Sequence, residues 1–257
     1  ASGQARRLID RPLDATGPGF AWVSGSDRVI AHLVPGDRGE PPRAPEVAGG
    51  PRIEVSTGSE STNRTWQDLL RTALDEARFR YYFTHELALV DASSGALRVL
   101  GADGQGRGIF TRASSSPDGR WLLVERLTEP FSRVVPIDGF GHRLELWSLE
   151  DLDAAPIVLA ELPAAEAVPT EGVPTGPRRV DWQPLESATL IWTEALDGGD
   201  PRTKVEHRDR LLRMSVEGTN ATTTLAAGGQ EFARTQHRSS GVDWLELPGR
   251  YLLREYD

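Results

Sequence analysis

The chain has 257 residues with 38% apolar content, no Cys and a formal net charge of −9, which suits one large β domain or two ordinary domains and excludes a disordered tail. Neither charge sign forms a long block, so the clustered Lys and Arg of a nucleic-acid binder are missing. No apolar run approaches the roughly 18 to 20 residues of a membrane span, so we expect a soluble protein that binds neither nucleic acid nor membrane.

Short alternating apolar runs bounded by Gly, Pro, Asp and Asn dominate the sequence and predict β-hairpins. In one kind of unit, a first strand leads through a polar turn into a second strand, at 20–34, 109–127, 178–196 and 239–257. A second kind, an apolar strand, a turn with Gly or Asp and another strand, lies between them at 86–101, 143–162 and 209–228.

The second units recur with a long period, since Leu87, Leu144 and Leu211 are 57 and 67 residues apart. Two hairpins in each period make a four-stranded sheet, which is the blade of a β-propeller. The turn Ser-Pro-Asp-Gly within 114–127 fits, because Asp-Gly supplies the positive φ of a tight turn and Pro ends the preceding strand.

We therefore predict an all-β chain of about four four-stranded antiparallel blades, part of a seven- or eight-bladed ring. The predicted blade pieces are 1–34, 52–127, 143–196 and 209–257.

Three windows depart from the strand pattern. The Pro-rich run 35–51 predicts an extended connection. Apolar residues in 65–83 follow a helical period, which predicts a short helical insertion near 65–80 with Thr65 as N-cap and Asp68 as an early acid. The run 160–179 carries four prolines and predicts a long connection with a short helix over 163–167.

Reactive groups are sparse. The pattern Gly-x-Ser-x-Gly is absent, and the five His residues show no metal-ligand spacing. The densest polar cluster, 196–209, offers Asp197, Asp200, His207 and Asp209 to a cation, but a polar loop in which Arg208 pairs with Asp209 is the favoured interpretation. We predict no metal and no cofactor.

Two further features have a structural and a functional interpretation. The loop GADGQGRG at 101–108 looks like a phosphate-binding loop, but no helix pattern follows it, so a connection between blades is favoured. The seven Trp residues could stack on sugars, yet most lie in strand patterns, where packing between blades is favoured.

Four long segments resemble, in the same order, the propeller region of the glutamyl endopeptidase branch of the prolyl oligopeptidase family of serine peptidases. They are NRTWQDLLRTALDEARFRYYFTHELALVD, SPDGRWLLVERLTEPFSRVVP, VPTGPRRVDWQP and ATLIWTEALDGGDPRTKVEHRD. The resemblance implies that an N-terminal propeller caps an α/β-hydrolase domain with a Ser-Asp-His triad. It also implies peptide substrates cut after Glu, with the propeller restricting the entry of folded proteins.

The triad and the hydrolase domain are absent from this chain, so no catalytic residue is predicted in it. We expect peptide substrates to bind through the missing hydrolase domain. A site for a Glu side chain needs cations, preferably Arg with its bidentate fork. Arg133, Arg178 and Arg208 lie in or beside predicted loops, and we take them as candidate substrate-binding residues beside the alternative of surface salt bridges.

Two other functions stay open on sequence alone. One is a stand-alone propeller that binds a protein or ligand, and the other is a sugar-binding propeller with exposed Trp. An incomplete ring leaves sheet edges uncovered, so we expect another chain to complete the ring or an open arc that oligomerises. The compartment is undetermined: exported or periplasmic, cytoplasmic, or the plastid stroma by the family resemblance.

Overall fold

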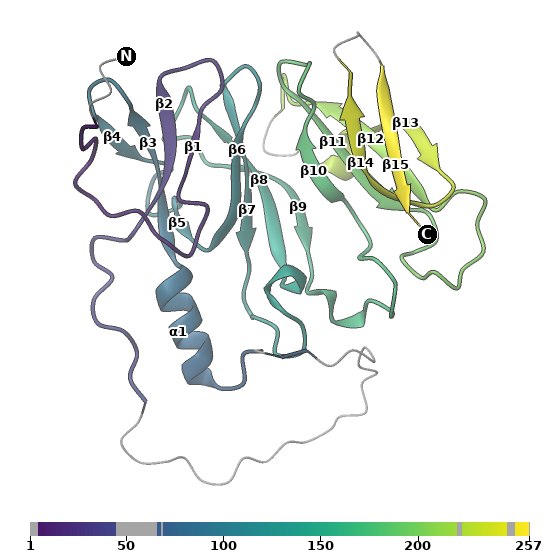
Figure 1. The fold of residues 1–257 in the computed structure, drawn as a ribbon, viewed down its shortest axis with the longest axis horizontal. Helices are drawn as coiled ribbons and strands as arrows, with labels where there is room; N and C mark the ends of the chain where they lie inside the picture. The colour runs from purple at the N-terminus through teal and green to yellow at the C-terminus, as the bar shows by residue number, and fades with distance from the viewer. Residues whose placement is uncertain (1–4, 45–65, 68, 220–222, 246–249, 257) are drawn as a thin grey trace.

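The computed structural model describes residues 5–44, 66–67, 69–219, 223–245 and 250–256. Four antiparallel sheets follow one another along the chain and stand side by side as a curved row (Figure 1). This arrangement confirms the predicted all-β class and the segment of propeller blades. Among these residues, no helix has the length and apolar character needed to cross a membrane.

Three of the sheets contain the expected four strands in sequence order. Sheet 1 has an added short strand, β5, against the start of β3, and sheet 4 has two strands among the described residues. Sheet 1 comprises β1 (Phe20–Trp22), β2 (Arg28–Leu33), β3 (His85–Asp91), β4 (Leu97–Val99) and β5 (Arg107–Gly108). Sheet 2 comprises β6 (Phe110–Ser115), β7 (Trp121–Leu127), β8 (His142–Ser148) and β9 (Ile157–Leu162). Sheet 3 comprises β10 (Arg178–Trp182), β11 (Thr189–Ala195), β12 (Asp209–Ser215) and β13 (Gln230–Thr235), and sheet 4 comprises β14 (Arg238–Trp244) and β15 (Tyr251–Tyr256).

The hairpins lie where the sequence pattern places them, but the sheets group them differently from the predicted pieces. Hairpins 109–127 and 143–162 share sheet 2, whereas the predicted pieces separate them. In the unit 209–228, the predicted second strand is replaced by a short helix, α2 (Leu225–Gly228), which Thr224 caps. The strand that pairs with β12 is β13, which follows this helix. A hairpin pattern shows which strands pair locally, but the grouping of hairpins into sheets depends on pairing across long connections.

The central strands are buried on both faces, and alternate side chains belong to different cores. In β7, Leu122 and Val124 pack toward sheet 1, while Leu123 packs toward sheet 3. Because successive side chains point to opposite faces of a sheet, a nearly continuous apolar run serves two interfaces at once. At the far side of sheet 1, Leu8 and Ile9 cover Ala31, Leu33, Ala88 and Val90.

The recurring turns touch one another at one end of the sheets. Gly119, in the turn of sheet 2, has φ +69°, and a Cβ there would lie 2.5 Å from the carbonyl oxygen of Ser24 in the turn of sheet 1. The Asp118 amide of the same turn donates to the carbonyl of Ser187 in sheet 3, at 3.1 Å. The repeated corner therefore has a packing role besides reversing the chain, and Gly119 is required both by its φ and by this close approach.

The helical insertion is α1 (Ala73–Phe83), which begins later than predicted. Its N-cap is Thr72, which forms a capping box with Asp75, whereas the predicted cap, Thr65, and Asp68 lie outside the described residues. The helix packs Phe79 and Phe83 against an apolar cluster formed mainly by the connection between β7 and β8. The short helix expected over 163–167 is a 3-10 turn, η2 (Ala165–Ala167). The connection predicted at 35–51 is described only as far as residue 44, without helix or strand.

Sheet 4 is attached to sheet 3 by buried charges. Arg238, with 7% of its side chain exposed, contacts Asp197 at 2.6 Å and Asp209 at 2.9 Å, and both carboxylates are fully buried. Arg208 binds Asp197 at 2.8 Å and Arg178 binds Asp209 at 2.6 Å. We call these five residues the ionic cluster. Burial alone would raise the pKa of Asp197, but its hydrogen bonds, first that from Arg238, outweigh burial and hold the pKa below its ordinary value.

A pair of buried histidines joins β2 to β3 at the base of α1. The His85 Nδ1 lies 3.0 Å from the carbonyl of Phe83 and must donate to it, so its Nε2 accepts from His32 Nδ1 at 2.7 Å. Both rings are 1% exposed. Burial, and next the neighbouring His85, lower the pKa of His32 to about 4, against an opposing effect of Asp14.

Replacing Arg238 by Met should lower the free energy of unfolding by about 3–5 kcal/mol, because two buried carboxylates lose their shared cation. Urea unfolding measures the loss. The matched control is Arg210→Met, which removes an Arg that is 40% exposed and pairs with Glu194, and it should cost at most about 1 kcal/mol. Equal losses in the two variants would contradict the importance of the ionic cluster.

The histidine pair predicts a loss of stability in mild acid. The folded state holds His32 neutral to about pH 4, whereas the unfolded chain takes up the proton near pH 6.5. The contribution is therefore complete above pH 6.5 and is lost as pH falls toward 4, by up to about 3 kcal/mol.

Urea unfolding of the wild type and of His32→Asn between pH 7.5 and 4.5 tests this, with the pH values chosen to span the titration of His32. The Asn amide can donate to His85 in place of Nδ1 but does not titrate, so the variant should show the shallower pH dependence. Parallel curves would show that the pair does not control the acid sensitivity.

Candidate functional site

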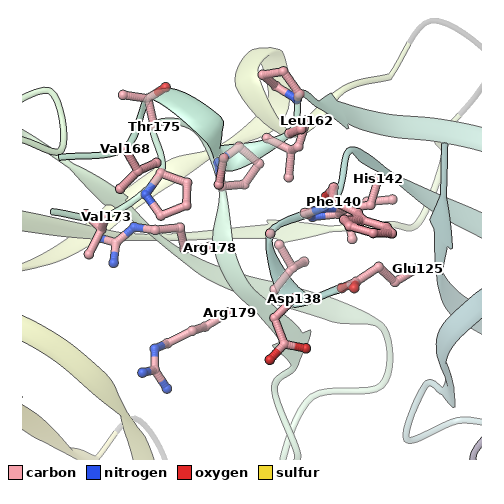
Figure 2. A pocket seen from close by; sticks show the side chains of 18 of the residues that line it. Glu125, Asp138, Phe140, His142, Leu162, Val168, Val173, Thr175, Arg178 and Arg179 are labelled. Atoms are coloured by element: carbon pink, nitrogen blue, oxygen red, sulfur yellow. Dashed lines mark hydrogen bonds between the residues drawn. The ribbon is translucent and has the colours of Figure 1, made fainter. Parts of the chain in front are cut away.

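A cavity of about 490 Å³ opens between sheets 2 and 3, at the end of the sheets opposite the stacked turns (Figure 2). We call it the interface cavity. Strands β6 to β8 form one wall with the 3-10 turn η1 (Ile137–Gly139), and β10 forms the other with the connection from β9. A cavity with apolar walls and a few polar groups is the usual form of a ligand site.

The connection between β9 and β10 supplies most of the apolar lining. It contributes Leu162, Val168 and Val173, together with four prolines, and η1 is followed by Phe140 on the opposite side. Pro fixes φ and lacks an amide proton, so this segment joins no strand ladder and, apart from the 3-10 turn η2, forms no regular structure beside the cavity. The Pro-rich sequence thus builds a rigid apolar wall.

The charged groups stand on the first strands and on η1. Arg112 lies on β6, Glu125 on β7 and Asp138 on η1, while Arg178 and Arg179 begin β10. Glu125 accepts a hydrogen bond from the hydroxyl of Thr111, at 2.6 Å. Arg112 is occupied in holding sheets 2 and 3 together, since it donates to backbone and carboxylate groups of β10.

The predicted residue Arg178 does line the cavity, but its guanidinium belongs to the ionic cluster. Its side chain is 11% exposed and binds Asp209 at 2.6 Å. The neighbouring Arg179 is exposed, and its Nη1 donates to the carbonyl of Ser240 on β14, at 2.9 Å. Figure 2 shows Arg179 and Asp138 in the same part of the view, with the guanidinium of Arg179 directed away from the apolar lining residues.

The other two predicted arginines lie outside the lining of the cavity. Arg133 pairs with Glu76 of α1 at 2.7 Å and has 52% of its side chain exposed. Arg208 pairs with Asp197 in the ionic cluster. Each of these three cations already has a carboxylate partner. Substrate binding by these three residues therefore stays a prediction.

The structure assigns other roles to the remaining polar candidates. Asp197 and Asp209 bind arginines, and within the described residues no group of three His, Cys, Asp or Glu is placed to hold a metal ion. The expected pairing of Arg208 with Asp209 is wrong, because Arg208 reaches Asp197 and Asp209 faces Arg178 and Arg238. The loop 101–108 ends in β5 and leads into β6, as a connection between sheets.

The tryptophans mostly pack inside the structure. Trp147, Trp182 and Trp192 are at most 6% exposed, and the indole of Trp182 donates to the carbonyl of Ser114 across the interface of sheets 2 and 3. Trp22, on the edge strand β1, is 60% exposed. This distribution gives little support to a row of sugar-stacking rings.

Sequence reasoning missed Arg179 and Asp138. The arginine is adjacent to a predicted residue, in the segment Pro-Arg-Arg, and the sequence does not reveal which of the two side chains faces the cavity. A bulge decides it, since the register of β10 against β11 shifts between Arg178 and Asp181. Asp138 lies on a short turn whose position depends on how the segment after β7 packs. No local sequence pattern indicates that packing.

Comparison with known proteins gives two clear relatives. Both are named "Probable glutamyl endopeptidase, chloroplastic": one from Oryza sativa subsp. japonica is 34% identical over 225 residues, and one from Arabidopsis thaliana is 32% identical over 222. The matches cover 85% and 84% of this chain but only 23% and 22% of the relatives. No protein-family model matches the sequence.

Solved structures with a similar course belong to other peptidases. A dipeptidyl aminopeptidase IV from Bacteroides ovatus aligns with a TM-score of 0.42 and 14% identity, over 87% of this chain and 28% of that one. An acylaminoacyl peptidase from Pyrococcus horikoshii aligns with a TM-score of 0.37 and 11% identity, over 88% and 26%. On the sequence relationship and the row of four-stranded sheets, the chain belongs to the glutamyl endopeptidase branch of the prolyl oligopeptidase family of serine peptidases, of which it spans a β-propeller segment.

Proposed function

We propose that this chain is the non-catalytic, substrate-gating portion of a serine peptidase that cleaves peptides after Glu. The observation that carries the proposal is the 34% identity over 225 residues to a protein named as a glutamyl endopeptidase. The chain spans 23% of that relative's length, so the reaction would take place in a hydrolase domain beyond this segment.

The chemistry of the described residues supports a non-catalytic role. A serine nucleophile needs a histidine base within hydrogen-bond reach. His32 and His85 are buried against each other, and His142 donates from Nδ1 to the carbonyl of Phe140, at 3.1 Å. The rings of His32, His85 and His142 therefore have structural partners.

The edges of the sheets suggest how the segment would filter substrates. The first strands form a continuous row: the Ser24 amide beside β1 donates to Ser115 of β6, Arg112 of β6 reaches β10, and Arg179 of β10 reaches Ser240 of β14. In a propeller such a row is the wall of the central channel. A wall of paired strands stays rigid, so the channel would admit an extended peptide and exclude a folded domain.

The partners follow from the same proposal. This segment would contact peptides as they pass to the hydrolase domain. Further blades, from the same or another chain, would complete the ring beside sheet 4. In sheet 4, Leu252 and Tyr256 of β15 are exposed, at 57% and 45%, which suits a surface that another element covers.

A stand-alone binding propeller is the second candidate. The observation that favours it is the interface cavity, which has apolar walls and a few charged groups. Under this alternative the cavity would bind its ligand without a catalytic domain.

The test compares the chain alone with the full-length natural protein that contains it. Internally quenched peptides with a single Glu-X or Gln-X bond serve as substrates. The chain alone should show no turnover and no labelling by a fluorophosphonate, whereas the full-length protein should cleave Glu-X over Gln-X by roughly ten- to a hundredfold in kcat/KM, as a charge-assisted contact predicts. Cleavage by the chain alone, or equal cleavage of both peptides by the full-length protein, would refute the proposal.

A further inference from the structure

Arg179 differs from the other arginines of the interface cavity in having no carboxylate partner among the described residues. Arg112 binds Asp181 at 2.5 Å, and Arg178 binds Asp209. The hydrogen bond from Arg179 to the Ser240 carbonyl uses one N–H of the five that a guanidinium carries. The remaining donors of an exposed side chain are available to a ligand.

The backbone at Arg179 is strained. Its φ is +54°, and Asp103 and Glu171 are the other non-glycine residues with positive φ in the described part of the chain. Asp visits this region more readily than a long side chain does. The strain coincides with the bulge in β10, and bulges commonly redirect a side chain beside a functional site. A glycine would relieve the strain here, so the arginine side chain is retained at a cost in stability.

Arg179 also stands on the row of first strands, beside an apolar hollow. Phe140, Val168 and Val173 line the same cavity as this arginine (Figure 2). A guanidinium at the rim of an apolar hollow matches an acidic side chain that is followed or preceded by an apolar one.

The acidic groups of the cavity restrict the ligand further. Asp138 forms no ion pair with another described residue, and Glu125 is engaged by a hydroxyl. A carboxylate among the lining residues disfavours a polyanion but can accept a peptide N–H. The charge pattern thus fits a single carboxylate on a neutral backbone.

We propose that Arg179 binds the acidic side chain of an extended peptide, with the neighbouring apolar side chain of that peptide in the interface cavity. This inference rests on the proposed function, because it names the residue through which the propeller segment would select Glu-containing chains. The carboxylate would accept two hydrogen bonds from the guanidinium in the bidentate arrangement.

Fluorescence anisotropy with this chain and two labelled peptides tests the site. The peptides are short Ala/Val/Gly sequences that contain a single Glu. In the matched control peptide, Gln replaces this Glu. The wild type should bind the Glu peptide about tenfold more tightly, as expected for a hydrogen-bonded charge. Arg179→Gln should remove this preference, and Arg179→Lys should retain part of it, since Lys keeps the charge but lacks the fork.

Arg143→Gln is the matched control. It removes a half-buried arginine from β8, which pairs with Glu161 and does not line the cavity, so the preference should be unchanged. Thermal unfolding of all variants separates binding from folding, because loss of the contact with Ser240 alone would change stability and leave the Glu/Gln ratio intact. Equal affinities of the wild type for both peptides, or an unchanged ratio in Arg179→Gln, would overturn the inference.

The two proposals fail separately. If the full-length protein cleaves after Glu and Arg179→Gln leaves the Glu/Gln ratio of kcat/KM unchanged, the assignment of Arg179 is wrong and the proposed function stands. If this chain prefers the Glu peptide through Arg179 but the full-length protein shows no Glu preference in cleavage, the site stands and the proposed reaction is wrong.

Discussion

Face-to-face packing of successive sheets is the interaction on which the rest of the structure depends. Each middle sheet must bury both faces, so its central strands are apolar at almost every position: Leu122, Leu123 and Val124 of β7 are at most 1% exposed, yet they serve two different cores. Burial of a side chain of this size is worth about 2 kcal/mol, and dozens of them are distributed over the interfaces. The turns and the row of first strands are aligned because the sheets are held in this order.

Buried charges hold sheets 3 and 4 together, where apolar side chains hold the other sheets. Arg238 lies between two buried aspartates, and the arrangement is favourable only while every member keeps its partners. This requirement explains why Arg178 and Arg208, which chemistry alone suggests for a carboxylate ligand, bind carboxylates of their own chain instead. At the same interface, Trp244 and Tyr251 of sheet 4 pack with Phe232 of sheet 3. The attachment is therefore specific in geometry.

The interface cavity lies between sheets 2 and 3, beside the connection that joins them. Their apolar cores fill the space between the strands, but the Pro-rich connection from β9 to β10 cannot pair with either sheet and lies beside the opening. The bulge at the start of β10 then separates the roles of two consecutive arginines. Arg178 is directed into the ionic cluster, and Arg179 toward the first strands and the cavity.

The sequence by itself determined the class of fold and the positions of the hairpins, because strand alternation, Asp-Gly turns and prolines are local signals that act over a few residues. It also determined the family relationship, through long motifs in a fixed order. Only the tertiary structure decided the grouping of hairpins into sheets, the start of α1 at Thr72, and the partners of each arginine. The physical reason is that pairing between strands and between buried charges depends on residues dozens of positions apart: Asp209 meets Arg178 only once sheet 3 has formed, and Asp197 meets Arg238 only once sheet 4 is folded against sheet 3.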